Sequence, residues 1–374
     1  MASLQTYTNG DGDKKHTLVV IFLRGGADGL NMVAPLEDPG YYRARPRIAI
    51  EKSKAVPLDG FFGLNPLLKD LEPAYKDGAL AIVHAAGSED DTRSHFEAQD
   101  LMEHGGIMGG GWLGRFLRTQ AGETVGPLTA VALGRSVPEC LRGAPSTTVL
   151  ESLQDFSLGT KRSPLIQSLS RLYGLQAGAL GSAGRSTLDA VARIEKLRAT
   201  PYSPEHGADY GKDNFSRDLM ELARLIKARV GVQAASVDLG GWDSHFGQST
   251  VMDPLMTRLS KGLSAFYRDL GSELEHTTVV AMTEFGRRVE ENSAFGTDHG
   301  RGSVMFVMGG GVRGGKVYGR WPGLTKDVLE GPGDLPVTTN YRNVLAPVLE
   351  RLGGVESLSK TFPEFELNPV PLFG

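Results

Sequence analysis

TLVVIFL, residues 17–23, is apolar throughout and rich in β-branched residues, and it leads directly into the polar loop RGGADG at residues 24–29. A strand with one face in water would alternate apolar and polar residues, so this run is predicted to be a strand covered on both faces. Further runs of the same kind occupy residues 79–84, 128–133, 234–239, 277–282 and 303–308.

Segments with helical periodicity separate these strands. They span residues 65–77, 94–104, 112–120, 163–176, 186–199, 213–230, 253–274 and 341–352. Strands that alternate with helices are typical of an α/β protein with a mostly parallel sheet. Residues 135–233 hold several helices but no convincing strand, so we expect a helical insertion within a single domain spanning residues 1–374.

Composition excludes some kinds of partner and site. Forty basic against 44 acidic residues give a net charge of −4, without the basic excess that nucleic-acid binding requires. The single cysteine, Cys140, cannot form an internal disulfide or a thiolate metal site. A bound metal would therefore need oxygen and nitrogen ligands.

Neither a signal peptide nor a membrane-spanning segment is apparent in the sequence. The first 16 residues are polar, and the apolar run 17–23 is too short to cross a bilayer. We therefore expect a cytoplasmic protein without a membrane partner, although an exported protein whose leader has been removed would look the same.

Polar residues collect immediately after four of the predicted strands. The segments are RGGADGLN (24–31), DDTRSH (90–95), GGWDSH (240–245), and TEFGRR (283–288) with GTDHG (296–300) just beyond it. Because the carboxyl ends of parallel strands face one edge of a sheet, these loops should converge on one site.

The side chains gathered in these loops have the chemistry of metal ligands. The candidates are Asp28, Asp243, His245, Glu284, Asp298 and His299. Carboxylates and imidazoles without thiols suit Zn²⁺ or Mn²⁺ best, with Mg²⁺ or Ca²⁺ as further options. Crowded carboxylates would repel one another unless cations lay between them. Two such ions can stabilise the attacking and leaving oxygens of an in-line displacement, as in phosphoryl or sulfuryl ester cleavage.

Each candidate ligand also has a purely structural interpretation. Asp28 could cap a helix that begins at the next residue. Asp243 and His245 could form a hydrogen-bonded pair within a loop, and the same holds for the Asp298-His299 pair. Glu284 could form an ion pair with the arginines that follow it.

Four residues are candidates for catalysis. Ser94 begins a Ser-x-x-Glu capping box, yet a hydroxyl at a helix N-terminus also suits a nucleophile that attacks an anionic ester. His95 could orient Ser94, bind substrate or simply be packed. Arg24 and Arg93 could hold an anionic substrate through paired hydrogen bonds, or they could be solvated surface arginines.

Together, the motifs RGGADGLN, RSHFEAQD, GGWDSH, TEFGRR and GTDHG resemble the DUF1501 family, which is placed in the alkaline phosphatase and sulfatase superfamily. The resemblance implies a three-layer α/β/α sandwich, alkaline-phosphatase-like, with a two-metal site. Asp28 matches an early aspartate ligand, Ser94 the nucleophile, and Asp243 with His245 a middle pair of ligands. His299 matches a final histidine ligand.

The sequence departs from the superfamily pattern after the strand at 277–282. An Asp-His pair is expected there, and the chain has Glu284-Phe285. Glu284 could replace the carboxylate, but Phe285 cannot bind a metal; Asp298 or His95 could fill the place, or the second metal could be missing.

The leading functional hypothesis is a metal-dependent hydrolase of phosphate or sulfate esters that acts on a small anionic substrate with Ser94 as nucleophile. Alternatives are a non-catalytic binding or assembly protein that keeps the fold, and a phosphomutase-type isomerase.

Overall fold

The computed structural model describes residues 16–120, 125–153 and 164–374, and a large sheet lies at its centre. The strands of this sheet are β1 (Thr17–Arg24), β5 (Leu80–Gly87), β6 (Ala130–Leu133), β7 (Thr148–Leu150), β8 (Ala234–Gly240), β9 (Thr277–Met282), β10 (Ser303–Gly309), β11 (Val317–Tyr318) and β12 (Thr339–Asn340). Their order is β11-β5-β10-β9-β1-β8-β6-β7, and β12 also pairs with β5.

Strand directions confirm a mostly parallel sheet with one exception. Strand β1 pairs in parallel with β8 and β9, whereas β10 runs antiparallel to both β5 and β9. No described helix lies between β9 and β10, so the chain reverses through a long loop instead of crossing over. This loop, residues 283–302, carries several of the candidate site residues.

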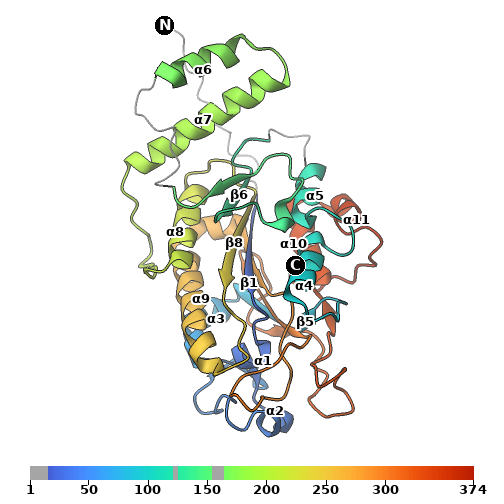
Figure 1. Cartoon of the computed structure of the whole chain (residues 1–374). Helices are drawn as coiled ribbons and strands as arrows, with labels where there is room; N and C mark the ends of the chain where they lie inside the picture. The colour runs from blue at the N-terminus through green and yellow to red at the C-terminus, as the bar shows by residue number, and fades with distance from the viewer. Residues whose placement is uncertain (1–15, 121–124, 154–163) are drawn as a thin grey trace.

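Helices cover both faces of the sheet, as Figure 1 shows. Against one face pack α3 (Glu72–Lys76), α8 (Asn214–Lys227) and α9 (Gln248–Leu270); against the other pack α4 (His95–His104), α5 (Trp112–Thr119), α10 (Tyr341–Gly353) and α11 (Leu358–Thr361). Successive residues of β1 alternate between the two cores, Val19 and Ile21 on one side and Leu18 and Val20 on the other. The three-layer α/β/α sandwich is therefore confirmed.

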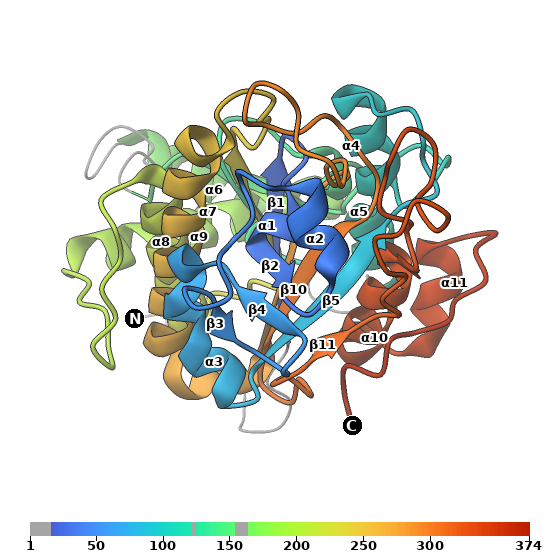
Figure 2. The same ribbon diagram turned by 90° about the horizontal axis from the view of Figure 1, so that it is seen from below.

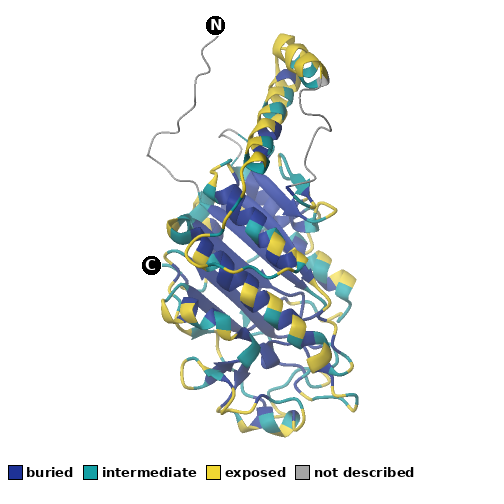
Figure 3. Ribbon diagram, turned by 90° about the vertical axis from the view of Figure 1, so that its left-hand side faces the viewer, coloured by how far each residue is buried: buried dark blue, intermediate teal, exposed yellow. Residues whose placement is uncertain are grey.

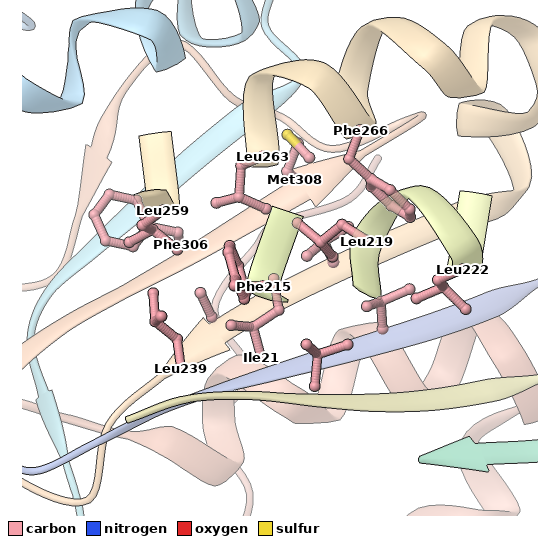
Figure 4. Packing of buried hydrophobic residues seen from close by; sticks show 14 of the residues in the cluster. Ile21, Phe215, Leu219, Leu222, Leu239, Leu259, Leu263, Phe266, Phe306 and Met308 are labelled. Carbon is pink, nitrogen blue, oxygen red and sulfur yellow. The ribbon is translucent and has the colours of Figure 1, made fainter. Parts of the chain in front are cut away.

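The core on the α8–α9 side is built from large apolar side chains (Figure 4). Phe215 and Leu219 of α8 meet Leu263 and Phe266 of α9 above Ile21 of β1, and all five are at most 4% exposed. Burying each such side chain contributes roughly 1.5–3 kcal/mol, which fixes both helices on the strands that carry the polar loops.

Residues 135–233 contain both helices and a strand. The helices α6 (Pro164–Leu175) and α7 (Ala179–Ala199) form a hairpin that extends away from the sheet and is largely exposed (Figures 1 and 3). Helix α8, by contrast, packs on the sheet. The expectation of no strand in this segment is wrong, because β7 pairs with β6 at the edge of the sheet.

A second, three-stranded sheet covers the end of the large one (Figure 2). It has the order β2 (Val33–Pro35), β4 (Phe62–Leu64), β3 (Val56–Pro57), and it lies near α1 (Gly29–Met32) and α2 (Pro39–Ala44). Short 3-10 helices complete the described elements: η1 (Pro66–Leu71), η2 (Glu139–Leu141), η3 (Gly271–His276) and η4 (Val355–Ser357). Within the described part of the chain, no helix has the length and apolar character needed to cross a membrane.

Candidate metal centre

Three separate segments bring their polar side chains together at one end of the sheet. Asp243 and His245 lie in the loop after β8, His299 lies in the loop between β9 and β10, and His95 is the first residue of α4. Figure 2 shows the two loops side by side, and the backbone N–H of Thr297 donates to the carbonyl of Ser244 between them.

Glycine makes the close approach of these loops possible. Gly25, at the end of β1, has φ +121°, and a Cβ there would lie 2.7 Å from the backbone nitrogen of Asp243. A larger residue would therefore push the loop after β8 outward and be strained in its own backbone. Gly25 thus allows Asp243 to lie against the end of the central strand β1.

Four potential ligand side chains converge at the centre of this cluster. Oδ1 of Asp243 lies 3.3 Å from His245 Nε2 and 3.4 Å from His299 Nε2, while its Oδ2 lies 3.6 Å from His95 Nε2. The Nε2 atoms of His245 and His299 are 2.9 Å apart. Ligands on a tetrahedral zinc ion with bonds of 2.0–2.1 Å are separated by about 3.3 Å, so the spacings match such an ion.

The hydrogen bonds behind the histidines decide which nitrogens carry protons. His299 Nδ1 lies 2.9 Å from the backbone carbonyl of Arg93, which can only accept, so Nδ1 is the protonated nitrogen. His245 Nδ1 faces Asp298 Oδ1 at 3.3 Å in the same way. Both Nε2 atoms therefore present lone pairs to each other, an arrangement that is unfavourable unless a cation lies between them.

His95 has the same arrangement. Its Nδ1 lies 2.8 Å from Glu284 Oε1, and its Nε2 is buried without a hydrogen-bond partner among the described residues. A carboxylate behind a histidine is the usual device for fixing the tautomer and orientation of a metal ligand. His95, Asp243 and His299 could together hold an ion, with His245 as the fourth ligand.

Electrostatics keep the carboxylates of the centre ionised. Burial alone would raise the pKa of Asp243, but the hydrogen bond and charge of Arg287, together with His245 and His95, outweigh burial and lower the pKa. Burial likewise opposes ionisation of Glu284, and hydrogen bonds from His95 and Gln99 hold its pKa below the ordinary value. The cluster therefore offers the negative charge that a divalent cation requires.

Phe285 packs against the ligands without binding a metal itself. Its ring is stacked on His95 at 4.8 Å between centroids and lies 4.9 Å from the ring of His299. Gly26 leaves room for it, because a Cβ there would lie 2.5 Å from the Phe285 ring. Phe285 therefore occupies the side of the cluster where the superfamily pattern would place a further ligand.

Arg287 joins the loops of the centre, a role that sequence reasoning missed. Its buried guanidinium donates to the carbonyls of Gly25 and Gly26, to that of Thr297 and to Asp243 Oδ1. In the sequence Arg287 is visible only as a possible ion-pair partner of Glu284, because its acceptors are backbone carbonyls from distant segments.

Asp28, predicted as a metal ligand, is not brought together with the other candidate ligands. Its side chain is completely buried, with Oδ2 at 2.5 Å and Oδ1 at 3.0 Å from two nitrogens of Arg45. Gln248 also donates to Oδ2, at 2.7 Å. Both carboxylate oxygens are therefore occupied, and the residue holds α1 to the segment that follows α2.

Glu284 and Asp298 were candidates for the ligand position left open by Phe285. In the structure, each lies on the far side of a histidine from the centre of the cluster. Glu284 is buried, and its Oε1 contacts His95 Nδ1 and also accepts from the backbone of Gly25 and from Gln99. Asp298 contacts His245 Nδ1. Both carboxylates therefore contact the Nδ1 side of a histidine whose Nε2 faces the centre of the cluster.

The predicted substrate arginines are engaged in ion pairs. Arg24 is bonded to Asp238 and Glu103 at 2.7 and 2.9 Å, and Arg93 is bonded to Asp334 at 2.5 Å. These geometries correct the prediction that both guanidiniums are available for an anionic substrate.

Ser94 is the residue before the first turn of α4, as the capping-box motif predicted. Its side chain makes no capping hydrogen bond, however, so the box itself is not formed. The Ser94 hydroxyl is consequently not committed to the helix.

A comparison with protein-family models assigns the chain. The model described as "Protein of unknown function (DUF1501)" matches residues 78–355, and the chain belongs to this family. No curated protein shows significant sequence similarity to the chain.

Several solved structures resemble this chain, with low TM-scores and low sequence identity. A putative sulfatase from Bacteroides thetaiotaomicron VPI-5482 has a TM-score of 0.41 and 10% identity, covering 96% of this chain and 77% of its own. The C-terminal periplasmic domain of EcEptC from Escherichia coli, in complex with Zn, has a TM-score of 0.37 and 7% identity, covering 80% and 74%. The lipoteichoic acid synthase LtaP from Listeria monocytogenes has a TM-score of 0.37 and 10% identity, covering 90% of this chain and 72% of its own. At these similarities, the basis for any functional assignment is the chemistry of the side chains described above.

Proposed function

We propose that the protein is a hydrolase of phosphate or sulfate esters that depends on one divalent ion bound by His95, Asp243, His245 and His299. The observation that carries the proposal is the convergence of three imidazole lone pairs on one carboxylate. Three nitrogens and one oxygen favour Zn²⁺, with Mn²⁺ as the next candidate. When bound, such an ion supplies Lewis acidity toward an ester oxygen.

A substrate can reach the centre from solvent. The side chains of Asp243 and Asp298 are 49% and 43% exposed, whereas Glu284 behind His95 is fully buried. Arg288 lies beside this opening, with Nη1 3.4 Å from Asp298 Oδ2. Because this pairing is longer than those of Arg24 and Arg93, at 2.5–2.9 Å, the Arg288 guanidinium is the more available one and holds the anionic part of a small ester in this proposal.

Ser94 is the nucleophile in this proposal. It adjoins the ligand His95, its hydroxyl makes no capping bond, and the N–H groups of the first turn of α4 favour an anion. The hydroxyl oxygen bonds to phosphorus or sulfur while the alcohol leaves, and water then hydrolyses the seryl ester to release phosphate or sulfate. Hydrolysis thus consumes only ester and water.

One ion, and not two, fits the side chains. Asp28 is neutralised by the guanidinium of Arg45, and Phe285 fills the space beside His95. Neither position can therefore supply a ligand for a second cation.

The test combines metal analysis with turnover. We expect about one zinc or manganese ion per purified chain. We also expect the protein to hydrolyse p-nitrophenyl phosphate, bis(p-nitrophenyl) phosphate or p-nitrophenyl sulfate, and a chelator to abolish this activity. His299→Ala should lose both the ion and turnover, whereas His104→Ala, a histidine at the other end of α4, should keep both. A protein that binds no divalent ion and cleaves none of these esters after metal addition refutes the proposal.

A second candidate, a non-catalytic protein that keeps one ion for binding or assembly, is favoured by the packing of Phe285 over two of the ligands. Ser94→Ala separates the two functions. Lost turnover with a retained ion and fold supports the hydrolase, whereas a wild-type protein that binds the ion but turns over no ester supports the binding protein.

A further inference from the structure

A polar cavity of about 530 Å³ lies beside the metal centre without including any of its four proposed ligands. Its volume is within the range of about 300–1,000 Å³ typical of small-molecule sites. The walls come from the ends of β1, β6 and β8 together with α4 and α8, and they include Arg24, Gln99, Glu103, Asp218 and Asp238.

One face of α4 connects this cavity to the metal centre. His95, Gln99 and Glu103 are spaced by four residues, so they lie in a row along the helix. At a rise of 1.5 Å per residue, Gln99 and Glu103 are about 6 and 12 Å along the axis from the ligand His95. Gln99 lines the cavity and donates to the same Glu284 oxygen that His95 contacts. The cavity therefore begins about one helical turn along α4 from His95.

The charges of the wall are mixed, and the cations are already paired. Five carboxylates and three guanidiniums line the cavity: Asp100, Glu103, Glu139, Asp218, Asp238, Arg24, Arg135 and Arg142. Each guanidinium makes an ion pair with a carboxylate, as Arg24 does with Asp238 at 2.7 Å. A second anionic group would therefore meet excess negative charge, and no arginine of the wall is left to neutralise it.

Two carboxylates of the wall offer acceptor capacity to a ligand. Asp238 is bonded to Arg24 through Oδ2, and no described residue donates to its Oδ1. Oδ1 of Asp218 is buried and accepts no hydrogen bond from the described chain, although Nη2 of Arg217 lies 3.5 Å from it. Arg24, Arg135 and Arg142 belong to the same wall, so a free cation entering the cavity would meet positive charge there as well. Neutral hydroxyl groups remain as the donors that match both.

We propose that this cavity binds a neutral polyhydroxylated group, such as a sugar ring, as the alcohol part of the ester substrate. Vicinal hydroxyls donate to the carboxylates of Asp238 and Asp218 and accept from the guanidinium of Arg24, which lines the same cavity. The role as part of a substrate rests on the proposed hydrolase function. Binding of the sugar itself does not, and the two are tested separately.

The test measures binding of neutral sugars without turnover. Methyl glycosides of glucose, galactose and mannose are titrated onto the metal-loaded protein and onto His299→Ala by saturation-transfer NMR, with ethylammonium and methyl sulfate as charged comparators. We expect at least one glycoside to bind both proteins, and Asp218→Asn and Asp238→Asn each to weaken it about tenfold or more. Asp253→Asn, a partly buried aspartate elsewhere on the surface, is the matched control and should leave binding unchanged.

The outcomes separate the two proposals. Glycoside binding that depends on Asp218 and Asp238 supports the cavity assignment even if no ester is hydrolysed. Binding of ethylammonium or methyl sulfate in place of every glycoside overturns it, as does glycoside binding that is insensitive to both substitutions. Loss of the ion in wild-type protein would count against the hydrolase alone.

Discussion

Nδ1 of His95 lies 2.8 Å from Oε1 of Glu284, a carboxylate that is fully buried behind the metal centre. Glu284 thus holds the His95 ring with its Nε2 lone pair toward Asp243. Replacing Glu284 by Gln removes the charge but keeps the shape, and we expect zinc affinity to fall by about 10- to 100-fold. Competition with a chromophoric chelator measures the zinc affinity. Glu275→Gln, at an exposed position, is the control, and equal affinities in both variants would contradict the role.

Asp28 and Arg45 should contribute to folding and not to metal binding. Removing one partner of a buried ion pair leaves an uncompensated charge, so Asp28→Asn should reduce the free energy of unfolding by about 3–5 kcal/mol. The folded fraction should still hold one ion per chain. Urea unfolding followed by metal analysis checks both, and a variant that folds with wild-type stability but loses its ion would reverse the assignment.

Gly26→Ala should disturb the centre through Phe285. The new Cβ would lie 2.5 Å from the ring, at a backbone φ of +67°, so we expect lower stability by about 1–3 kcal/mol and weaker zinc binding. Gly60→Ala is the matched control, because Gly60 has φ +89° but no atom within 4 Å of its Cβ position. It should show the backbone strain alone, with unchanged zinc affinity. The idea fails if the two variants bind zinc equally well.

His84 should make the fold sensitive to acid. Burial lowers the pKa of His84 from 6.5 to about 4, so the folded protein resists protonation that the unfolded chain accepts. The contribution of neutral His84 to the free energy of unfolding is therefore complete above pH 6.5. It is lost progressively as the pH falls from 6.5 through 4, by roughly 3 kcal/mol in total. His84→Gln, which can keep a donor to the carbonyl of Val33, should show a shallower loss of stability between pH 6.5 and 4. Urea unfolding across this range compares the two, and parallel curves would rule the effect out.

Much of the fold could be predicted because the apolar runs are long and continuous. All six of them form strands, from β1 to β10, and the helices between them lie close to the predicted positions. The antiparallel direction of β10 could not be predicted, since a hydrophobic pattern carries no strand direction. Strands such as β3 and β11 have two residues each, too few for any periodicity.

The candidate site was only partly predictable from sequence. The glycine-flanked segments identified Asp243, His245 and His299, which the structure brings together. Asp28 has the same kind of setting after a strand, but its partner Arg45 is found only in the folded chain. Whether a carboxylate binds an ion or orients a histidine depends on differences of a few ångströms, which no spacing in the sequence encodes.

Oε1 of Glu284 contacts three residues, because it lies 2.8 Å from Nδ1 of His95, 2.8 Å from Nε2 of Gln99 and 2.9 Å from the backbone nitrogen of Gly25. A proposed metal ligand, His95, and a residue of the cavity wall, Gln99, therefore share one acceptor atom. Any movement of Gln99 on occupation of the cavity also changes the hydrogen bond that orients His95. The two sites are then thermodynamically linked, and whatever factor the ion applies to the affinity for a sugar, the sugar must apply to the affinity for the ion.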